Sequence, residues 1–277
     1  MILKLFYINV LAFFLINCGS EKKVNYDLDK YLQTEIKLPS ELNEISGICF
    51  SDEGKLFGHN DERGIIYQID LKSGEIIKSF QLGNKMIKAD FEDLAIVGKK
   101  FFIITSNGIL FEFEEGEDLQ KVKVIEKDLH FSSKFNIEGL CYDETSNSLL
   151  ITSKEYPGKN LGNVRAVYSY SLSSNSVDQK PKFVISLKDL KENFNIRDFY
   201  PSAITKDRAT GNYLILSAKG KPSLIKINPL GKIISAIKLN PKTHPQPEGI
   251  AFDKNNNILI CDEGASKSGK ITIYKMP

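Results

Sequence analysis

Histidine and cysteine are scarce in this sequence, which contains three of the former and four of the latter. No Cys-x-x-Cys pair and no cysteine–histidine spacing of the kind that holds zinc is present. The sequence also lacks a Gly-x-Ser-x-Gly elbow, a phosphate-binding loop and a dinucleotide-binding glycine motif. These absences give no support to a zinc site, a serine nucleophile or a nucleotide cofactor. We read Cys49 and Cys141 as small buried hydrophobic residues.

Strong charge of one sign is also missing, since the formal net charge is only +2. No basic cluster with interleaved aromatic residues appears, so we expect no nucleic-acid partner. Strong helical periodicity is absent as well, apart from one possible helical turn at 188–193. The composition, 42% hydrophobic and 26% charged, is that of a folded globular protein.

Only the first residues carry a long apolar run, and at 5–16 it is too short for a comfortable membrane span. Lys4 precedes it, and Leu15-Ile16-Asn17-Cys18 follows the pattern of a bacterial lipobox. We predict a signal peptide at 1–17, a lipid on Cys18 that attaches the protein to a membrane, and a polar tether at 18–32. The alternative is an ordinary signal peptide with an incidental cysteine. We expect a cell-envelope, extracytoplasmic location, with the outer membrane or cell surface favoured.

A short motif recurs along the rest of the chain. Its anchor residues are Ser46, Glu92, Glu138, Ser202 and Glu248, with spacings of 46, 46, 64 and 46 residues. Each anchor begins an apolar stretch such as Glu138-Gly139-Leu140-Cys141, and each repeat breaks into four short apolar segments separated by turns. This period predicts an all-β fold, a five-bladed β-propeller of four-stranded antiparallel blades at 33–277.

The fifth repeat ends after its third segment, at 271–274. Residues 34–38 precede the first repeat and match the outermost segments of other repeats, 78–82 and 235–239. We therefore predict that this N-terminal strand completes the last blade and closes the ring, which removes an exposed sheet edge.

Acidic residues concentrate where each innermost strand should begin and where the next strand should end. In a propeller these positions lie on the same face, at one mouth of the central channel. Crowded carboxylates repel one another, and calcium binds six to eight oxygen ligands. We therefore predict a calcium site, with the candidate ligands Glu44, Asp61, Glu62, Glu92, Glu138, Glu155, Glu248, Asp262 and Glu263. The alternative is that these acids cap backbone amides and pair with lysines around a wet channel.

The three histidines, His59, His130 and His244, also fall in segments predicted to face this mouth. A histidine beside a calcium-bound water could act as a general base. Ordinary surface histidines are the simpler explanation and the one we prefer, so we name no catalytic residue.

The chain resembles the SdiA-regulated protein family, a group of bacterial envelope proteins. The matching motifs are Glu44-Ile45-Ser46-Gly47-Ile48, Asn60-Asp61-Glu62, Phe91-Glu92-Asp93-Leu94-Ala95, Ile137-Glu138-Gly139-Leu140 and Ser153-Lys154-Glu155. The resemblance implies a five-bladed propeller with a calcium site and an interaction role. Lys154 stands where an acid would be expected, which leaves Glu155 as the ligand of that segment.

We expect a lipid-anchored calcium-binding propeller that presents its loop face to a protein or glycan partner. Exposed aromatic residues such as Tyr156, Phe194 and Tyr200 would serve that contact. The alternative is a calcium-dependent hydrolase, lactonase- or phosphoesterase-like, with its site at the same mouth. That alternative requires His59 or His244 within reach of a bound water.

Overall fold

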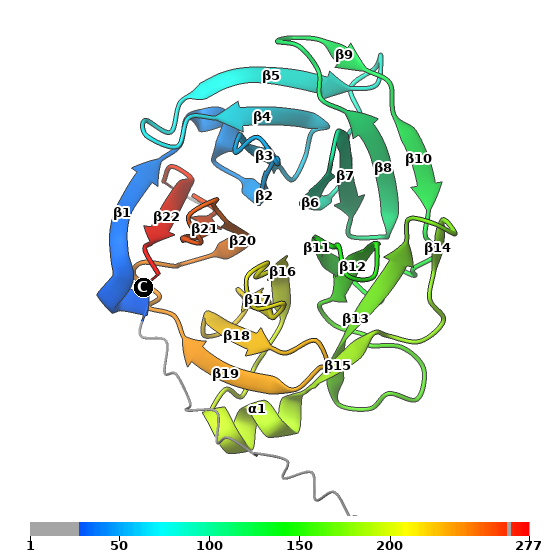
Figure 1. Cartoon of the computed structure of the whole chain (residues 1–277), viewed down its shortest axis with the longest axis vertical. Helices are drawn as coiled ribbons and strands as arrows, with labels where there is room; N and C mark the ends of the chain where they lie inside the picture. Colours follow the sequence, from blue (N-terminus) through cyan, green and yellow to red (C-terminus); the bar gives the residue numbers. More distant parts are fainter. Residues whose placement is uncertain (1–27, 265–266, 277) are drawn as a thin grey trace, which may run out of the picture.

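A computed structural model describes residues 28–264 and 267–276, and it places five small sheets in a ring around a central axis (Figure 1). The strand nearest the axis in each sheet contacts the corresponding strand of both neighbouring sheets. The prediction of a five-bladed propeller is thus confirmed. The predicted signal peptide, Cys18 and most of the tether lie outside the described residues.

The blades follow one another in chain order, each running from the axis outward. Blade 1 is β2 (Ile45–Phe50), β3 (Leu56–Asn60), β4 (Ile65–Ile69) and β5 (Ile76–Leu82); blade 2 is β6 (Phe91–Val97), β7 (Lys100–Thr105), β8 (Ile109–Glu114) and β10 (Ile125–Asp128). Blade 3 is β11 (Ile137–Asp143), β12 (Ser148–Ser153) and β13 (Val164–Ser171), with β14 (Ser176–Val177) and β15 (Phe183–Ser186) outside; blade 4 is β16 (Pro201–Lys206), β17 (Tyr213–Ser217), β18 (Ser223–Ile227) and β19 (Ile233–Lys238). Blade 5 is β20 (Pro247–Phe252), β21 (Ile258–Asp262), β22 (Lys270–Tyr274) and β1 (Leu32–Lys37).

The N-terminal strand closes the ring as predicted. β1 pairs antiparallel with β22, and Glu35 lies opposite Thr272 in that ladder. Blade 5 therefore contains both the first and the last strand of the described chain, and its outer edge is covered by β1 rather than left open.

Two blades depart from four simple strands. In blade 3 the outermost strand is broken into β14 and β15, which pair with different parts of β13. In blade 1 the short strand β9 (Lys121–Val122) adds to β5 in parallel, although it lies between β8 and β10 in the chain. This excursion joins blades 1 and 2, and Glu115 within it binds Lys78 and Lys55 of blade 1.

Helical structure is limited to short connections. Two 3₁₀ turns lie at Leu28–Tyr31 and Ser40–Leu42, and α1 (Leu187–Phe194) leads into blade 4. The Ser186 hydroxyl caps α1 by accepting the N–H of Asp189, and Asn195 ends it with a positive φ. The helix therefore spans eight residues rather than the single turn expected at 188–193. No helix within the described ranges is long and apolar enough to cross a membrane.

The core lies between the faces of adjacent blades, where apolar strand residues pack together. Between blades 1 and 2 the contacts are aromatic, and the rings of Phe57 and Phe101 meet edge to face with centroids 5.0 Å apart. These sheet-to-sheet contacts fix the orientation of each blade, and thereby hold the innermost strands around the axis.

Each innermost strand carries the same irregularity at its anchor residue. The pairing register shifts between residues 45 and 47, 91 and 93, 137 and 139, 201 and 203, and 247 and 249. A bulge of this kind places two successive residues opposite one on the partner strand. The anchor and the residue after it can therefore both turn toward the channel, instead of alternating.

Candidate functional site

The acidic mouth is a cavity of about 290 Å³ at the end of the channel where the innermost strands begin. Its walls carry seven carboxylic acids and one lysine. The acids are Glu44, Asp61, Asp90, Glu92, Glu138, Glu248 and Glu263, and the lysine is Lys154. They come from blades 1, 2, 3 and 5; no described residue of blade 4 lines the cavity.

Two glutamates at the centre of the mouth share a hydrogen bond. Burial, the neighbouring Glu138 and the nearby Asp90 raise the pKa of Glu92 far above its ordinary value. Burial also raises the pKa of Glu138, although the Lys154 ammonium group opposes this from 2.8 Å. The amide of Asn136 donates to the same oxygen of Glu138 that Lys154 contacts. Burial and mutual repulsion therefore disfavour the state in which both carboxyl groups are charged.

The remaining acids of the mouth also lack enough nearby positive charge to stabilise their ionised forms. Burial and the charge of Glu138 raise the pKa of Glu248 to about 8. Burial and Glu44 raise the pKa of Asp61 to about 6, and one buried oxygen of Asp61 has no hydrogen-bond partner in the described structure. Burial and Asp61 raise the pKa of Glu263 as well. One lysine therefore does not compensate the negative charge that this cavity would carry at neutral pH.

The structure brings six of the nine predicted ligands to this cavity, namely Glu44, Asp61, Glu92, Glu138, Glu248 and Glu263. Glu62 is exposed and Glu155 lies 3.5 Å from Lys219, both outside the lining. Asp262 is fully buried and accepts hydrogen bonds from His244 and from the N–H of Gln246. Among the described residues, no three acidic, histidine or cysteine side chains already surround one point as a finished metal cage would.

The expectation that the histidines face the mouth is wrong for the two buried ones. His244 is held between Asp262, 2.7 Å from Nδ1, and the Tyr274 hydroxyl, 2.5 Å from Nε2. His59 is fully buried, its Nδ1 lies 2.9 Å from the Asn60 carbonyl, and burial lowers its pKa to about 4. His130 is exposed beside Asp128 and does not line the cavity.

Sequence reasoning missed Asp93, which lies directly beneath the acidic mouth. Its side chain is 3% exposed, and its two oxygens accept the N–H groups of Leu94 and Leu140 at 2.8 and 2.7 Å. A third N–H, from Ile204, also points to it. Asp93 therefore ties blades 2, 3 and 4 together at the axis. Burial nevertheless raises its pKa well above the ordinary value, against the effect of the three N–H groups.

Small residues at the matching position of the other blades make room for Asp93. They are Gly47, Gly139, Ala203 and Gly249. A Cβ on Gly47 would lie 2.8 Å from the Asp93 Oδ1, and one on Gly249 would lie 3.2 Å from the Gly47 Cα. A single acid, Asp93, where the other four repeats carry glycine or alanine, was the sequence signal for a side chain that fills the axis. We call this side chain the plug. This layer separates the acidic mouth from the other end of the channel.

These features define a class of protein: a five-bladed β-propeller with a carboxylate-lined mouth and a plugged axis. The sequence profile of the SdiA-regulated family matches residues 23–266, most of the chain. The chain belongs to the SdiA-regulated family. No curated protein shows significant sequence similarity to it.

Solved structures with the same fold are distant in sequence. Glutaminyl cyclase from Myxococcus xanthus aligns over 87% of this chain and 94% of its own, with a TM-score of 0.55 and 14% identity. A glucose dehydrogenase aligns over 88% of this chain and 100% of its own, with a TM-score of 0.55 and 9% identity. Virginiamycin B lyase from Staphylococcus aureus aligns over 88% and 74%, with a TM-score of 0.45 and 16% identity. The first two likenesses show the shared fold alone.

Proposed function

We propose that this protein is a lipid-anchored propeller of the cell envelope that binds calcium at its acidic mouth and uses that face as an interaction module. The observation that carries the proposal is the surplus of acid in the mouth, seven carboxylic acids against one lysine. Burial and the neighbouring carboxylates raise the pKa values of Glu92 and Glu248, and Lys154 does not offset this effect.

The donor set fits a hard cation. Every acid of the mouth offers oxygen, the buried oxygen of Asp61 lacks a partner, and calcium accepts carboxylate, amide and water oxygens in flexible geometry. Glu92, Glu138 and Glu248 would hold the ion, with Asp61, Glu44 and Glu263 around the same cavity. Calcium would supply the missing positive charge and connect the inner ends of blades 5, 1, 2 and 3.

Lys154 has a specific part in this proposal. Its ammonium group lies 2.8 Å from Glu138, and its side chain is largely buried in the mouth. It therefore competes with a cation for one of the central ligands. Proton loss from the Glu92–Glu138 pair accompanies calcium binding, so affinity falls as pH decreases.

The interaction role draws on the side of the same face away from the acids. The cationic groups of Arg165 and Lys219 lie over the ring of Tyr200, at 4.6 and 4.7 Å from its centroid. Arg165 also donates to the backbone carbonyl of Glu155, and the next residue, Tyr156, is exposed. An acidic mouth beside a basic aromatic cluster can orient a protein or glycan partner. The hydrolase alternative required His59 or His244 at the mouth, and their burial favours binding over catalysis.

Thermal unfolding of residues 19–277, with calcium and with chelator, tests the proposal. At calcium a hundredfold above its dissociation constant, linkage predicts stabilisation of about 2.7 kcal/mol. The double variant Glu138→Gln/Glu248→Gln should lose this effect. The control is Glu62→Gln/Glu155→Gln, which removes the same number of acids outside the cavity and should retain it. An unfolding temperature that does not respond to millimolar calcium would contradict the metal site.

Membrane attachment needs its own experiment. In cells that express the full chain, we expect the protein in the membrane fraction, and Cys18→Ala should release it or stop its maturation. A Cys49→Ala variant is the matched control, because Cys49 belongs to blade 1. Equal membrane attachment of Cys18→Ala and the unaltered chain would contradict the lipid anchor.

A further inference from the structure

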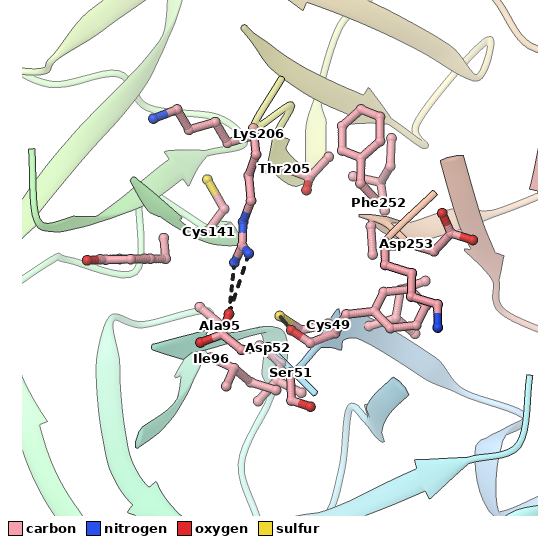
Figure 2. A pocket seen from close by; sticks show the side chains of 18 of the residues that line it. Cys49, Ser51, Asp52, Ala95, Ile96, Cys141, Thr205, Lys206, Phe252 and Asp253 are labelled. Atoms are coloured by element: carbon pink, nitrogen blue, oxygen red, sulfur yellow. Dashed lines mark hydrogen bonds and ion pairs between the residues drawn. The ribbon is translucent and has the colours of Figure 1, made fainter. Parts of the chain in front are cut away.

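The channel has a second cavity, at the end opposite the acidic mouth. This turn-side cavity has a volume of about 430 Å³ and lies among the turns that join the first and second strands of blades 1, 3, 4 and 5 (Figure 2). It shares no lining residue with the mouth, and the Asp93 layer lies between them. Its size is in the range of pockets that enclose small organic molecules.

The interior of the turn-side cavity is lined by small and weakly polar side chains. Matching positions of the five innermost strands contribute Cys49, Ala95, Cys141, Thr205 and Ala251. Burial raises the pKa of the Cys49 thiol to about 12 and that of Cys141 well above its ordinary value, so neither is a ready nucleophile. Within the described residues, the Thr205 hydroxyl makes no hydrogen bond to the protein. The interior thus suits an apolar body and offers one free hydroxyl.

Aromatic and aliphatic side chains line the part of the cavity that lies nearer to solvent. Phe50, Tyr142 and Phe252 are partly exposed where they line the cavity, and each also packs against the core between two blades. Side chains anchored in this way provide a rigid apolar wall, because the core holds their rotamers. An apolar ligand would bury surface here without ordering mobile residues.

The charged side chains at the rim differ in how fully they are paired within the protein. Every rim acid is satisfied by the protein itself: Asp52 binds Arg208, Glu53 binds Lys55, Glu144 binds Lys206, and Asp253 accepts N–H groups of its own turn. Among the described residues Lys254 has no acidic partner. Lys206 is fully engaged, since it contacts Asp143, Glu144 and Thr145. Within the described part of the chain, Lys254 is therefore the rim cation without an acidic partner, and Arg208 is held by Asp52 alone.

Arg208 crosses the opening of the cavity. It belongs to blade 4, and its partner Asp52 belongs to blade 1, so the pair spans the end of the channel, as the dashed lines at Asp52 show (Figure 2). Both of its terminal nitrogens approach one oxygen of Asp52 at 3.4 Å, and both side chains are about two-thirds exposed. Contacts this long and exposed contribute little energy. The guanidinium group can therefore accept a second anion with the forked geometry that suits a carboxylate.

We propose that the turn-side cavity binds a small organic anion with an apolar body, whose carboxylate or sulfonate contacts Arg208 while the body enters the channel above Asp93. The apolar interior, the free hydroxyl and the exposed, weakly paired guanidinium group of Arg208 favour this class of ligand. The site is independent of the proposed calcium site, because the two cavities share no lining residue.

The test uses residues 19–277, which contain every element of the described fold. The probe is 8-anilinonaphthalene-1-sulfonate, an apolar anion whose fluorescence increases in an apolar site. We expect saturable binding at one site per chain, displaced by 1-naphthoate and not by the neutral 1-naphthalenemethanol at the same concentration. Displacement by both compounds alike would overturn the role of the anion.

Four variants locate the probe. Arg208→Gln should weaken binding about fivefold or more, because a charge-assisted contact is lost, whereas Arg63→Gln, an exposed arginine outside this cavity, should leave it unchanged. Thr205→Phe should fill the cavity and abolish binding, with its fold checked by thermal unfolding. Unchanged affinity in Arg208→Gln, or in a folded Thr205→Phe, would overturn the proposal. So would loss of binding in Glu138→Gln/Glu248→Gln, since that result would place the probe at the acidic mouth.

Discussion

The two ends of the channel are built from the same five strands and yet have opposite chemistry. At the acidic mouth, carboxylic acids outnumber their one cation and raise one another's pKa values. At the turn-side cavity, every rim acid already has a partner and the interior is apolar. Asp93 lies between these two regions, fully enclosed by backbone N–H groups.

This difference shows how a repeated strand can carry several functions. In blades 1, 2, 3 and 5 the anchor residue lines the mouth and the next residue lies at the axis, and in all five blades the residue two positions further on lines the opposite cavity. In blade 2 these are Glu92, Asp93 and Ala95. Each level of the channel is thus set by one residue per repeat and can change without altering the blades.

Removal of the Asp93 carboxyl group should have the largest effect on the free energy of unfolding. Asp93→Ala leaves three buried N–H groups without an acceptor, and we expect unfolding free energy to fall by about 3 kcal/mol or more. Urea unfolding measures it. The control Asp178→Ala removes an exposed aspartate and should change stability little. A loss below about 1 kcal/mol for Asp93→Ala would show that the plug is not structural.

Addition of a methyl group at Gly47 should have the second-largest effect on stability. A Cβ at Gly47 would lie 2.7 Å from His59 Nε2 and 3.0 Å from the Asp93 Cα, and the second of these contacts cannot be relieved by a side-chain rotation. We expect Gly47→Ala to cost about 2 kcal/mol. Ser46→Ala, at the preceding residue, loses only a hydrogen bond to the Glu92 carbonyl and should cost about 1 kcal/mol. Thermal unfolding should reproduce this order, and the reverse order would argue against tight packing at the axis.

The pH dependence of stability should distinguish the mouth from the rest of the molecule. Because the pKa of Glu248 is raised from 4.5 to about 8, the folded chain holds a proton that the unfolded chain releases. Without calcium, stability should therefore fall between about pH 4.5 and 8, with a limiting slope of roughly 1.4 kcal/mol per pH unit for this group. Glu248→Gln or saturating calcium should flatten the curve. Unchanged slopes in both cases would show that the mouth acids titrate normally.

The smallest effect is expected at the rim of the turn-side cavity. Arg208→Gln removes only a long, exposed ion pair, so we expect unfolding free energy to change by less than about 0.5 kcal/mol. Chemical denaturation measures this value beside the probe-binding experiment. A larger loss would mean that Arg208 supports the fold, and its effect on ligand binding would then need the Lys254→Gln variant for confirmation.

The repeat itself was readable from the sequence because it depends on local patterns. Apolar segments of strand length, turn residues between them and the match of 34–38 to other outer strands predicted the blades and the closing strand correctly. Glu92, Glu138 and Glu248 were placed together at the mouth for the same reason, since equivalent residues of a ring converge.

The remaining details depended on backbone irregularity and packing between blades. Successive side chains of a regular strand point to opposite faces, and the bulge at Glu92 breaks that rule and lets Asp93 turn inward. His244 and Asp262 looked like mouth residues, but they satisfy each other within blade 5, beside Tyr274. Contacts between residues far apart in the chain leave no periodic trace in the sequence. For the same reason the excursion of β9 to blade 1 was not anticipated.

The closing strand also ties the folding of blade 5 to both ends of the propeller. In the described part of the chain β1 is the first strand to be synthesised and β22 is the last, and an ion pair between Lys270 and Glu35 joins residues 235 positions apart. Until β22 has been made, β1 has no partner strand, and blade 5 keeps an open edge that can recruit other chains. A chain broken off before β22 would therefore keep that edge exposed.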